Sequence, residues 1–468
     1  MTLGVQLTAQ DTVDKALELA AAAGADGCVV LVDQTSSANL RWANNTLTTN
    51  GVMHGSRATV IATVGAGEAT ASGVVAKSAV TEDSLAELVS AAVAAARAAD
   101  PAEDAKPLVE GGAGPGWEDE PGETSIQVYE SFAPALGEAL ERATKENRWL
   151  FGFADHQITT TYLGTSTGVR LRHEQPDGHV TVTAKSGDRA ESAWVGAATR
   201  DFTDVDVSGL DAELVRRLGW ARRKVELPAG RYPTVLPADA VSDLVTYLYW
   251  TMEGRDAHEG RSVFSSPSGG TRVGEQLSPH PVTLRSDPHA AGLESAPFVI
   301  AHRSGPASSV FDNGLTLRAT DWISGGTLEN LLQTRFTAGL TGLSTTPWID
   351  NYVLEVEGAT GSVDDVVAGV DDGLLLTCLW YIRVVDPQTL LLTGLTRDGV
   401  YRVEGGEVTG AVNNFRFNES PVDLLARFTA AGATVPAFSR EWGDEFGRTA
   451  APPLLVPDFN MSSVSQAS

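Results

Sequence analysis

Two histidine–glutamate pairs come closest in residue type to a zinc site. His258-Glu259 and His173-Glu174 each place an imidazole beside a carboxylate, and both groups are ordinary zinc ligands. A helical zinc site needs two imidazoles about one turn apart on one face. The residues four and five positions after His258 are a serine and a valine, and Gly254 and Gly260 disfavour a helix around it. We therefore expect His258 to make an ordinary surface or loop contact.

A second candidate pair is His173 with His179. These residues flank Pro176-Asp177-Gly178, which we expect to form a turn, so the two imidazoles would face each other on neighbouring strands. Histidines beside a turn are more often solvated than bound to metal. We assign no metal to this pair.

One serine and two cysteines remain as nucleophile candidates. Gly164–Gly168 fits the Gly-x-Ser-x-Gly pattern around Ser166, but that pattern exposes a hydroxyl only where a strand turns into a helix. Here another strand pattern follows, so we expect a hairpin loop. Cys28 and Cys378 lie in apolar stretches that we expect to form strands, which predicts buried and unreactive thiols. Two cysteines build neither a disulfide framework nor a zinc cage.

The elements that position these residues predict an α+β fold. An amino-terminal α/β module spans 1–105, a linker spans 106–124, a helix with an antiparallel meander spans 125–227, and a β-rich carboxy-terminal domain spans 228–458. Within the first module, strands are expected at 28–33, 43–47 and 56–64, and Asn50-Gly51 is expected as a turn between the last two.

Charge and hydropathy exclude several classes of function. The 468 residues include 60 acidic and 34 basic side chains, a formal net charge of −26. Such a balance opposes binding to nucleic acid or to anionic lipid. It favours a solubilising surface over an acid-lined site for basic peptides. The first residues show no basic stretch followed by an apolar run, so we expect no secretory signal and a cytoplasmic location.

Several segments together resemble the TldD/PmbA peptidase family, and they cover most of the chain. They are Arg41–Asn45, Ala229–Leu236, Glu259–Phe264, Gly269–Glu275, Leu284–Pro288, Gly325–Leu328, Leu395–Gly399 and Val412–Pro421. The resemblance implies a two-chain peptidase, in which a zinc-bearing subunit pairs with a zinc-free, TldE-like homologue to trim short or unfolded peptides in an enclosed cavity. The zinc subunit of this family uses two histidines and a glutamate on one helix, and a later cysteine.

Carried over to this sequence, none of those metal positions holds a normal zinc ligand. The helix motif falls within 237–254, and the cysteine position falls within 412–420, which contains no cysteine. The three helix positions, each uncertain by one residue, are Val245 or Thr246, Thr246 or Tyr247, and Trp250 or Thr251. Zinc takes thiolate, imidazole or carboxylate ligands. The resemblance therefore implies the zinc-free partner subunit, with no catalytic, cofactor-binding or metal-binding residue of its own.

We accordingly expect a non-catalytic subunit of a TldD/TldE-type metallopeptidase. Its partner would be a zinc-bearing homologue, zinc would reside in that partner, and the substrate would be a peptide. Two alternatives stay open. One is a stand-alone peptide-binding scaffold, as a homodimer. The other is an autonomous hydrolase that uses Ser166 or a metal near His258. In the subunit and the scaffold alike, an open sheet edge in the carboxy-terminal region would let a peptide add as a strand.

Overall fold

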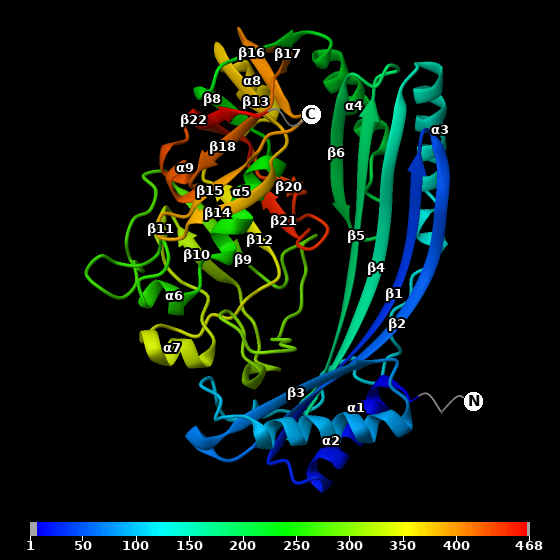
Figure 1. Cartoon of the computed structure of the whole chain (residues 1–468), viewed down its shortest axis with the longest axis vertical. Coiled ribbons are helices and arrows are strands. Elements are labelled where there is room, and N and C mark those ends of the chain that lie inside the picture. Colours follow the sequence, from blue (N-terminus) through cyan, green and yellow to red (C-terminus); the bar gives the residue numbers. More distant parts are fainter. Residues whose placement is uncertain (1–6, 466–468) are drawn as a thin grey trace.

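A long antiparallel sheet forms one side of the molecule. The computed structural model describes residues 7–465, and Figure 1 shows this sheet as a tall, curved wall beside the carboxy-terminal part. Its strands, in spatial order, are β3 (Ala71–Ser78), β2 (Thr46–Val64), β1 (Gly27–Ala43), β4 (Trp149–Thr165), β5 (Arg170–Lys185) and β6 (Ser192–Thr199). The sheet thus takes strands from both 1–105 and 125–227, and the domain boundaries given above remain predictions.

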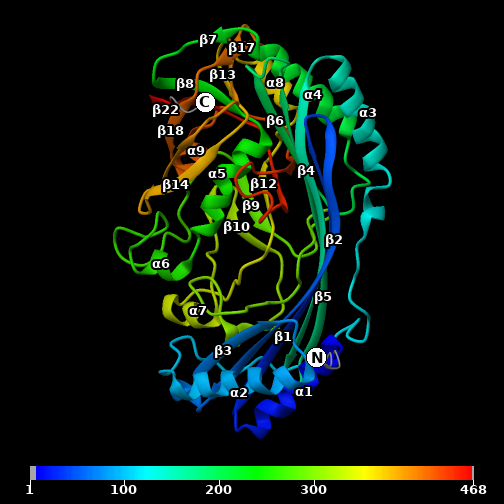
Figure 2. The ribbon, with the colours of Figure 1, turned by 45° about the vertical axis from the view of Figure 1, so that its right-hand side comes forward.

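Helices cover the outer face of this sheet. They are α1 (Ala9–Ala22), α2 (Glu82–Ala98), α3 (Phe132–Lys145) and α4 (Val207–Ala221). Figure 2 shows α3 on the side of the sheet away from the carboxy-terminal part, and α1 and α2 at its lower end. Along β1 the even-numbered residues pack on these helices: Cys28 and Val30 against α1 and α2, and Leu40 and Trp42 against α3.

The inner face of the sheet is apolar at one end and polar further along. Val29 and Leu31 pack against Phe298 and Phe311 of the carboxy-terminal part. This burial on both faces explains the continuous apolar run at the start of β1. Further along, the odd-numbered residues of β1 and its neighbours are mostly polar, because successive side chains of a strand point to opposite faces. The alternation therefore presents polar groups toward the carboxy-terminal part.

Two predicted turns lie in the middle of strands. Asn50-Gly51 is inside β2, and the hairpin turns instead at Asn44 and Asn45, which take φ values of 49° and 62°. Asparagine tolerates that left-handed conformation, and the Asn45 side chain also accepts a hydrogen bond from Leu150 N at 2.7 Å. The predicted strand over 43–47 is therefore wrong. Pro176-Asp177-Gly178 lies within β5; proline is tolerated there because β6 pairs with β5 only from Gly178 onward.

Other local predictions are confirmed or corrected. The loop between β4 and β5 contains Ser166, as predicted. The helix predicted to be absent around His258 exists as α6 (Gly254–His258). Gly254 is the first residue of this helix and lies against the Gln333 side chain, where a Cβ would clash. Cys378 is buried as predicted, but it follows β13 (Asp372–Leu376) and is not part of a strand.

The carboxy-terminal part contains two further sheets. The strands of the first, in spatial order, are β11 (Thr327–Leu328), β10 (Thr320–Ser324), β9 (Val282–Ser286), β12 (Tyr352–Val356), β21 (Thr449–Ala451) and β20 (Val435–Ala437). Those of the second are β14 (Trp380–Asp386), β15 (Leu391–Leu395), β18 (Phe415–Glu419), β22 (Leu454–Val464), β8 (Gly230–Leu236), β13, β16 (Val400–Glu404), β17 (Glu407–Val412) and β7 (Lys224–Val225), with β19 (Ala430–Ala431) paired to β22.

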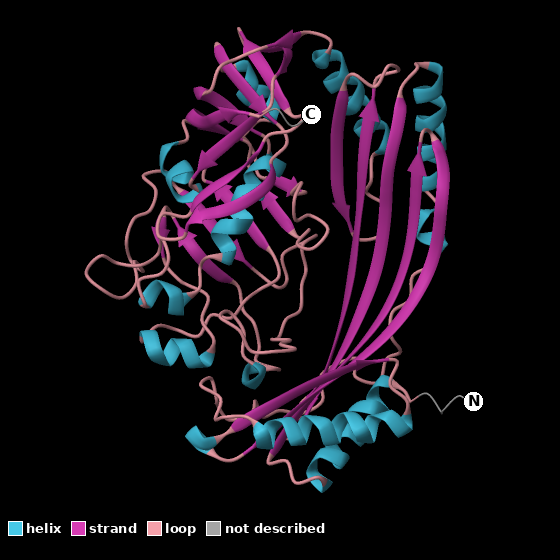
Figure 3. Ribbon diagram, viewed as in Figure 1, coloured by secondary structure: helices cyan, strands magenta, loops and turns pink. Residues whose placement is uncertain are grey.

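The helices of this part are short, except for one that is central. They are α5 (Ala238–Trp250), α6, α7 (Arg335–Thr341), α8 (Val363–Ala368) and α9 (Pro421–Arg427). Helix α5 belongs to the largest hydrophobic core of the described residues, together with side chains from both sheets. Figure 3 shows the resulting mixture of helices and strands, which is the α+β fold expected from the sequence. Within 7–465, no helix is long and apolar enough to span a membrane.

Candidate functional site

Helix α5 occupies the position at which the resemblance places a zinc motif. Every residue from Ala240 to Tyr249 is buried. The helix follows Pro237, whose fixed φ suits a helix start, and its high apolar content suits an element enclosed on all sides. The side chains from Ala240 to Tyr249 therefore contact protein and not solvent, whereas Asp239 and Trp250 at the two ends are half-buried.

The motif positions on α5 hold a closed network of hydroxyl and aromatic groups. Thr246 Oγ1 lies 3.0 Å from the Tyr352 hydroxyl, which lies 2.8 Å from Ser242 Oγ. Tyr247 donates its hydroxyl hydrogen to the Ile382 carbonyl at 2.8 Å. Trp250 packs with its ring centroid 5.0 Å from that of Trp442. Neither these hydroxyls nor the buried Val245 fit zinc, which prefers thiolate, imidazole or carboxylate.

The other candidate metal ligands are not brought together. His173 and His179 lie on the same strand, β5, six residues and therefore about 20 Å apart; the prediction that they face each other is wrong. His179 stacks on Phe438 with centroids 5.8 Å apart. His258 is exposed at the end of α6. Within residues 7–465, no group of three or more His, Cys, Asp or Glu side chains could hold a metal ion.

The nucleophile candidates have structural surroundings. Ser166 Oγ accepts a hydrogen bond from Cys28 N at 3.0 Å, which fastens the hairpin loop to the start of β1. Burial raises the pKa of the Cys28 thiol to about 12 and that of Cys378 to about 11. Both thiols are therefore protonated at neutral pH, and a protonated thiol is a poor nucleophile.

Two hollows lie between the inner face of the long sheet and the carboxy-terminal part. The first, here called the acidic cleft, has a volume of about 720 Å³ and is bordered by β5, β6, β20 and the segment 443–449. The second, the apolar cavity, has a volume of about 580 Å³ and is lined by Phe298, Leu317 and Trp348. Both volumes fall in the range of ligand sites, ~300–1,000 Å³.

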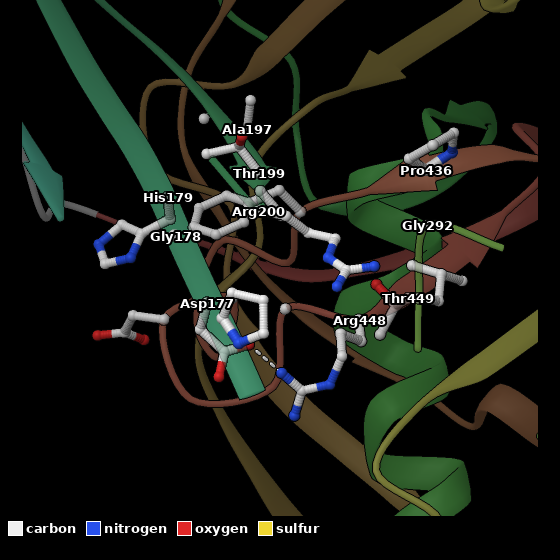
Figure 4. Close-up of a pocket in the computed structure, with 18 of the residues that line it drawn as sticks. Asp177, Gly178, His179, Ala197, Thr199, Arg200, Gly292, Pro436, Arg448 and Thr449 are labelled. Carbon is white, nitrogen blue, oxygen red and sulfur yellow. Dashed lines mark hydrogen bonds and ion pairs between the residues drawn. The ribbon is translucent and has the colours of Figure 1, made fainter. Parts of the chain in front are cut away.

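Arg448 separates the two hollows and joins the two halves of the molecule. Its guanidinium pairs with Asp177 on β5 and with Asp350 of the carboxy-terminal part, and its Nε donates to the Asp350 carbonyl at 2.9 Å. Figure 4 shows Arg448 reaching across to Asp177. Burial raises the pKa of both carboxyls, and the positive charge of Arg448 opposes that rise. The ion pairs of Arg448 link residues far apart in the sequence, and no local sequence motif predicts them.

Carboxylates dominate the walls of the acidic cleft. Nine Asp and Glu side chains line it, against Arg200, Arg448 and His179. Arg200 pairs with Glu294, and Arg448 pairs with two of the nine. Among the described residues no ion pair is made by the other six, which are Asp155, Asp201, Asp204, Asp239, Asp444 and Glu445. Burial raises the pKa of Asp239 to about 6, and its carboxylate accepts from Phe438 N at 2.9 Å.

Alternation along β4 and β5 explains how part of this lining arises. Asp155 and Gln157 on β4, and Gln175, Asp177 and His179 on β5, are odd-numbered and so share the inner face. In Figure 4, Asp177, Ala197 and Thr199 lie across the hollow from Pro436 and Thr449. The alternation along β4 and β5 is visible in the sequence, but the sequence does not show which segments form the opposite wall of the cleft.

Two protein-family models match this sequence, and both describe domains of the same family. A family model described as the PmbA/TldA metallopeptidase C-terminal domain matches residues 229–463, and one described as the central domain of the same family matches 123–222. No curated protein matches the sequence.

Solved structures share the whole fold. TldE from Thermococcus kodakarensis is similar with a TM-score of 0.76 at 16% identity, over 96% of this chain and 99% of that one. A putative modulator of a DNA gyrase from Thermotoga maritima has a TM-score of 0.75 at 16% identity, over 97% and 100%. A putative modulator of DNA gyrase from Bacteroides thetaiotaomicron has a TM-score of 0.72 at 15% identity, over 97% and 98%. At such identities the likeness shows the fold alone.

Proposed function

Because the chain belongs to the PmbA/TldD metallopeptidase family, we propose that it is the zinc-free subunit of a two-chain, TldD/TldE-type peptidase. Its partner is a zinc-bearing homologue, which holds the metal and cuts the peptide. This chain completes the peptide-binding enclosure and supports the partner's active site. The assembly works in the cytoplasm, on short or unfolded peptides.

The observation that carries the proposal is what occupies the metal positions of α5. Thr246 is tied to Tyr352, and Tyr247 is tied to Ile382 and Trp442, all within the core. Replacing these side chains by histidine or glutamate would bury polar groups without partners, which is costly. These side chains therefore pack in the hydrophobic core, and this arrangement supports a role for the chain without metal.

The acidic cleft supports the peptide part of the proposal. It lies in the single chain, between two sheets, and has the volume of a ligand site. A stand-alone peptide-binding homodimer would use the same cleft, and this is the second candidate function. The two differ in whether a zinc-bearing homologue is required for activity.

The test is metal content and peptide cleavage of the purified chain, alone and co-expressed with a zinc-bearing homologue from the same genome. We expect the lone chain to be free of zinc and inert, and the pair to co-purify, contain zinc and cleave. A matched control replaces the zinc-binding histidines of the homologue, which should abolish cleavage and leave the pair intact.

Two outcomes would contradict the proposal. Stoichiometric zinc with cleavage by the lone chain would place a metal site in it. A homodimer that binds peptides and does not associate with any zinc-bearing homologue would favour the second candidate function. If the lone chain hydrolyses peptides, Ser166→Ala and His258→Ala decide whether the third possibility, an autonomous hydrolase, applies.

A further inference from the structure

The acidic cleft is bordered by two strands that lie at the edges of their sheets. Within the described residues 7–465, strand β6 pairs only with β5, and β20 pairs only with β21. Residues of both strands line the cleft, and Figure 1 shows β6 as the edge of the long sheet nearest the carboxy-terminal part. A free edge offers a row of backbone N–H and C=O groups to an added strand.

The edge of β6 is suited to accept such a strand, and that of β20 is not. The cleft-lining residues of β6 are Gly196, Ala197, Ala198 and Thr199, which are small and uncharged. Proteins usually protect an exposed edge with charge, proline or a bulge. In β20, by contrast, Pro436 removes one backbone donor.

The charge around the edge of β6 indicates which side chains an added peptide strand should have. Six cleft carboxylates make no ion pair among the described residues, and they stand on both walls: Asp201 and Asp204 follow β6, whereas Asp444 and Glu445 belong to the carboxy-terminal part. The two arginines of the cleft are already paired with Glu294, Asp177 and Asp350. The cleft therefore attracts cations and repels anions.

We propose that the acidic cleft binds an extended peptide with basic side chains, whose backbone pairs with the free edge of β6. Its lysine or arginine side chains lie against the carboxylates of the two walls. This inference rests on the proposed function in taking the ligand to be a peptide. It adds the charge of the peptide and the strand on which the peptide lies, contrary to our sequence expectation that the acid only keeps the protein soluble.

The binding test uses the purified full chain and an eight-residue peptide of alternating lysine and valine, with capped ends and a fluorescent label. We expect saturable binding in fluorescence anisotropy that weakens as salt is added. A peptide with glutamate in place of lysine should not bind. Equal binding of the two peptides, or binding of neither, would overturn the proposal.

Protein variants locate the site. Asp201→Asn and Asp444→Asn remove one charge from each wall, and each should weaken binding about fivefold, the factor for ~1 kcal/mol between charges in water. The matched control is Glu87→Gln on α2, which is also exposed but lies at the far end of the long sheet. If Glu87→Gln weakens binding as much as the cleft variants do, the effect is one of net charge and the cleft assignment fails.

Peptide variants test the backbone pairing. A strand pairs through every second N–H, so the lysine peptide is N-methylated at alternate residues in two frames. One frame should lose at least tenfold in affinity and the other should keep most of it. Equal affinity of both frames and of the unmethylated peptide would exclude pairing with β6.

The outcomes also separate this inference from the proposed function. If the lone chain binds the lysine peptide but no zinc-bearing partner cuts with it, the subunit role fails and the cleft assignment stands. If the pair cuts peptides but the chain is indifferent to their charge, the cleft assignment alone fails.

Discussion

Replacing Arg448 by methionine should loosen the two halves of the molecule from each other. Arg448 pairs with Asp177 on β5 and with Asp350 beyond the cleft. Methionine keeps most of the side-chain volume but removes the positive charge and every donor. Arg448→Met therefore leaves two carboxylates facing each other without a cation.

The expected cost lies between those of buried and surface ion pairs. Arg448 has 13% of its side-chain surface exposed, whereas Asp177 and Asp350 keep 46% and 44% because they line the cleft. Breaking a fully buried pair costs about 3–5 kcal/mol, and a surface pair contributes below about 1 kcal/mol. We expect Arg448→Met to lower the free energy of unfolding by about 2 kcal/mol at pH 8.

The cost should shrink in acid. Burial already raises the pKa of Asp177 and Asp350 above 3.8, and losing the Arg448 charge raises both further. A carboxyl group whose pKa is higher in the folded protein than in the unfolded chain lowers the free energy of unfolding. This penalty is complete above the folded pKa and disappears as pH falls toward the unfolded pKa. The difference between wild type and variant should therefore be larger at pH 8 than at pH 5.

Urea unfolding at pH 5 and pH 8 measures both effects. The matched control is Arg216→Met, which breaks surface pairs with Asp364 at 2.9 Å and with Glu213 at 2.7 Å, and each pair should contribute below about 1 kcal/mol. Adding Asp177→Asn to Arg448→Met should restore part of the loss at pH 8. The reasoning is refuted if Arg448→Met matches the control at pH 8, or if its cost does not fall at pH 5.

Three further predictions concern the core. Burial raises the pKa of Asp243 to about 8, so wild-type stability should fall between about pH 4 and pH 8 by up to ~1.4 kcal/mol per unit, and Asp243→Asn should flatten that slope in urea unfolding. Tyr352→Phe removes the hydroxyl bound to Ser242 and should cost about 1–3 kcal/mol, seen as a lower thermal midpoint. A thiol-specific colorimetric reagent should label neither Cys28 nor Cys378 in the folded protein, and both after denaturation, because both are buried.

Each of these has a contradicting result. An unchanged pH slope in Asp243→Asn would mean that another group causes it. A Tyr352→Phe variant as stable as wild type would mean that the hydroxyl network around α5 contributes nothing. Fast labelling of either thiol in the folded protein would show that its strand or loop opens to solvent.

Local pattern predicted the fold class but misplaced two turns. The strand and helix periodicities gave an α+β chain, and Ser166 was placed in a hairpin loop. Asn50-Gly51 and Pro176-Asp177-Gly178 have turn composition and still lie in strands. Their backbones are held extended by the long pairings of β2 with β1 and of β5 with β4. Propensity acts over a few residues, and a ladder of this length overrides it.

The sequence by itself determined which residue types stand on α5 where the resemblance places the zinc ligands, since chemical identity needs no geometry. It also determined the family, through motifs spread over most of the chain. Only the tertiary structure decided where the cleft lies and what closes it. Arg448 meets Asp177 across 271 residues of sequence, and the six cleft carboxylates that make no ion pair within 7–465 come from separate segments. Side chains so distant along the chain become neighbours only when whole sheets pack together, and no local pattern encodes that packing.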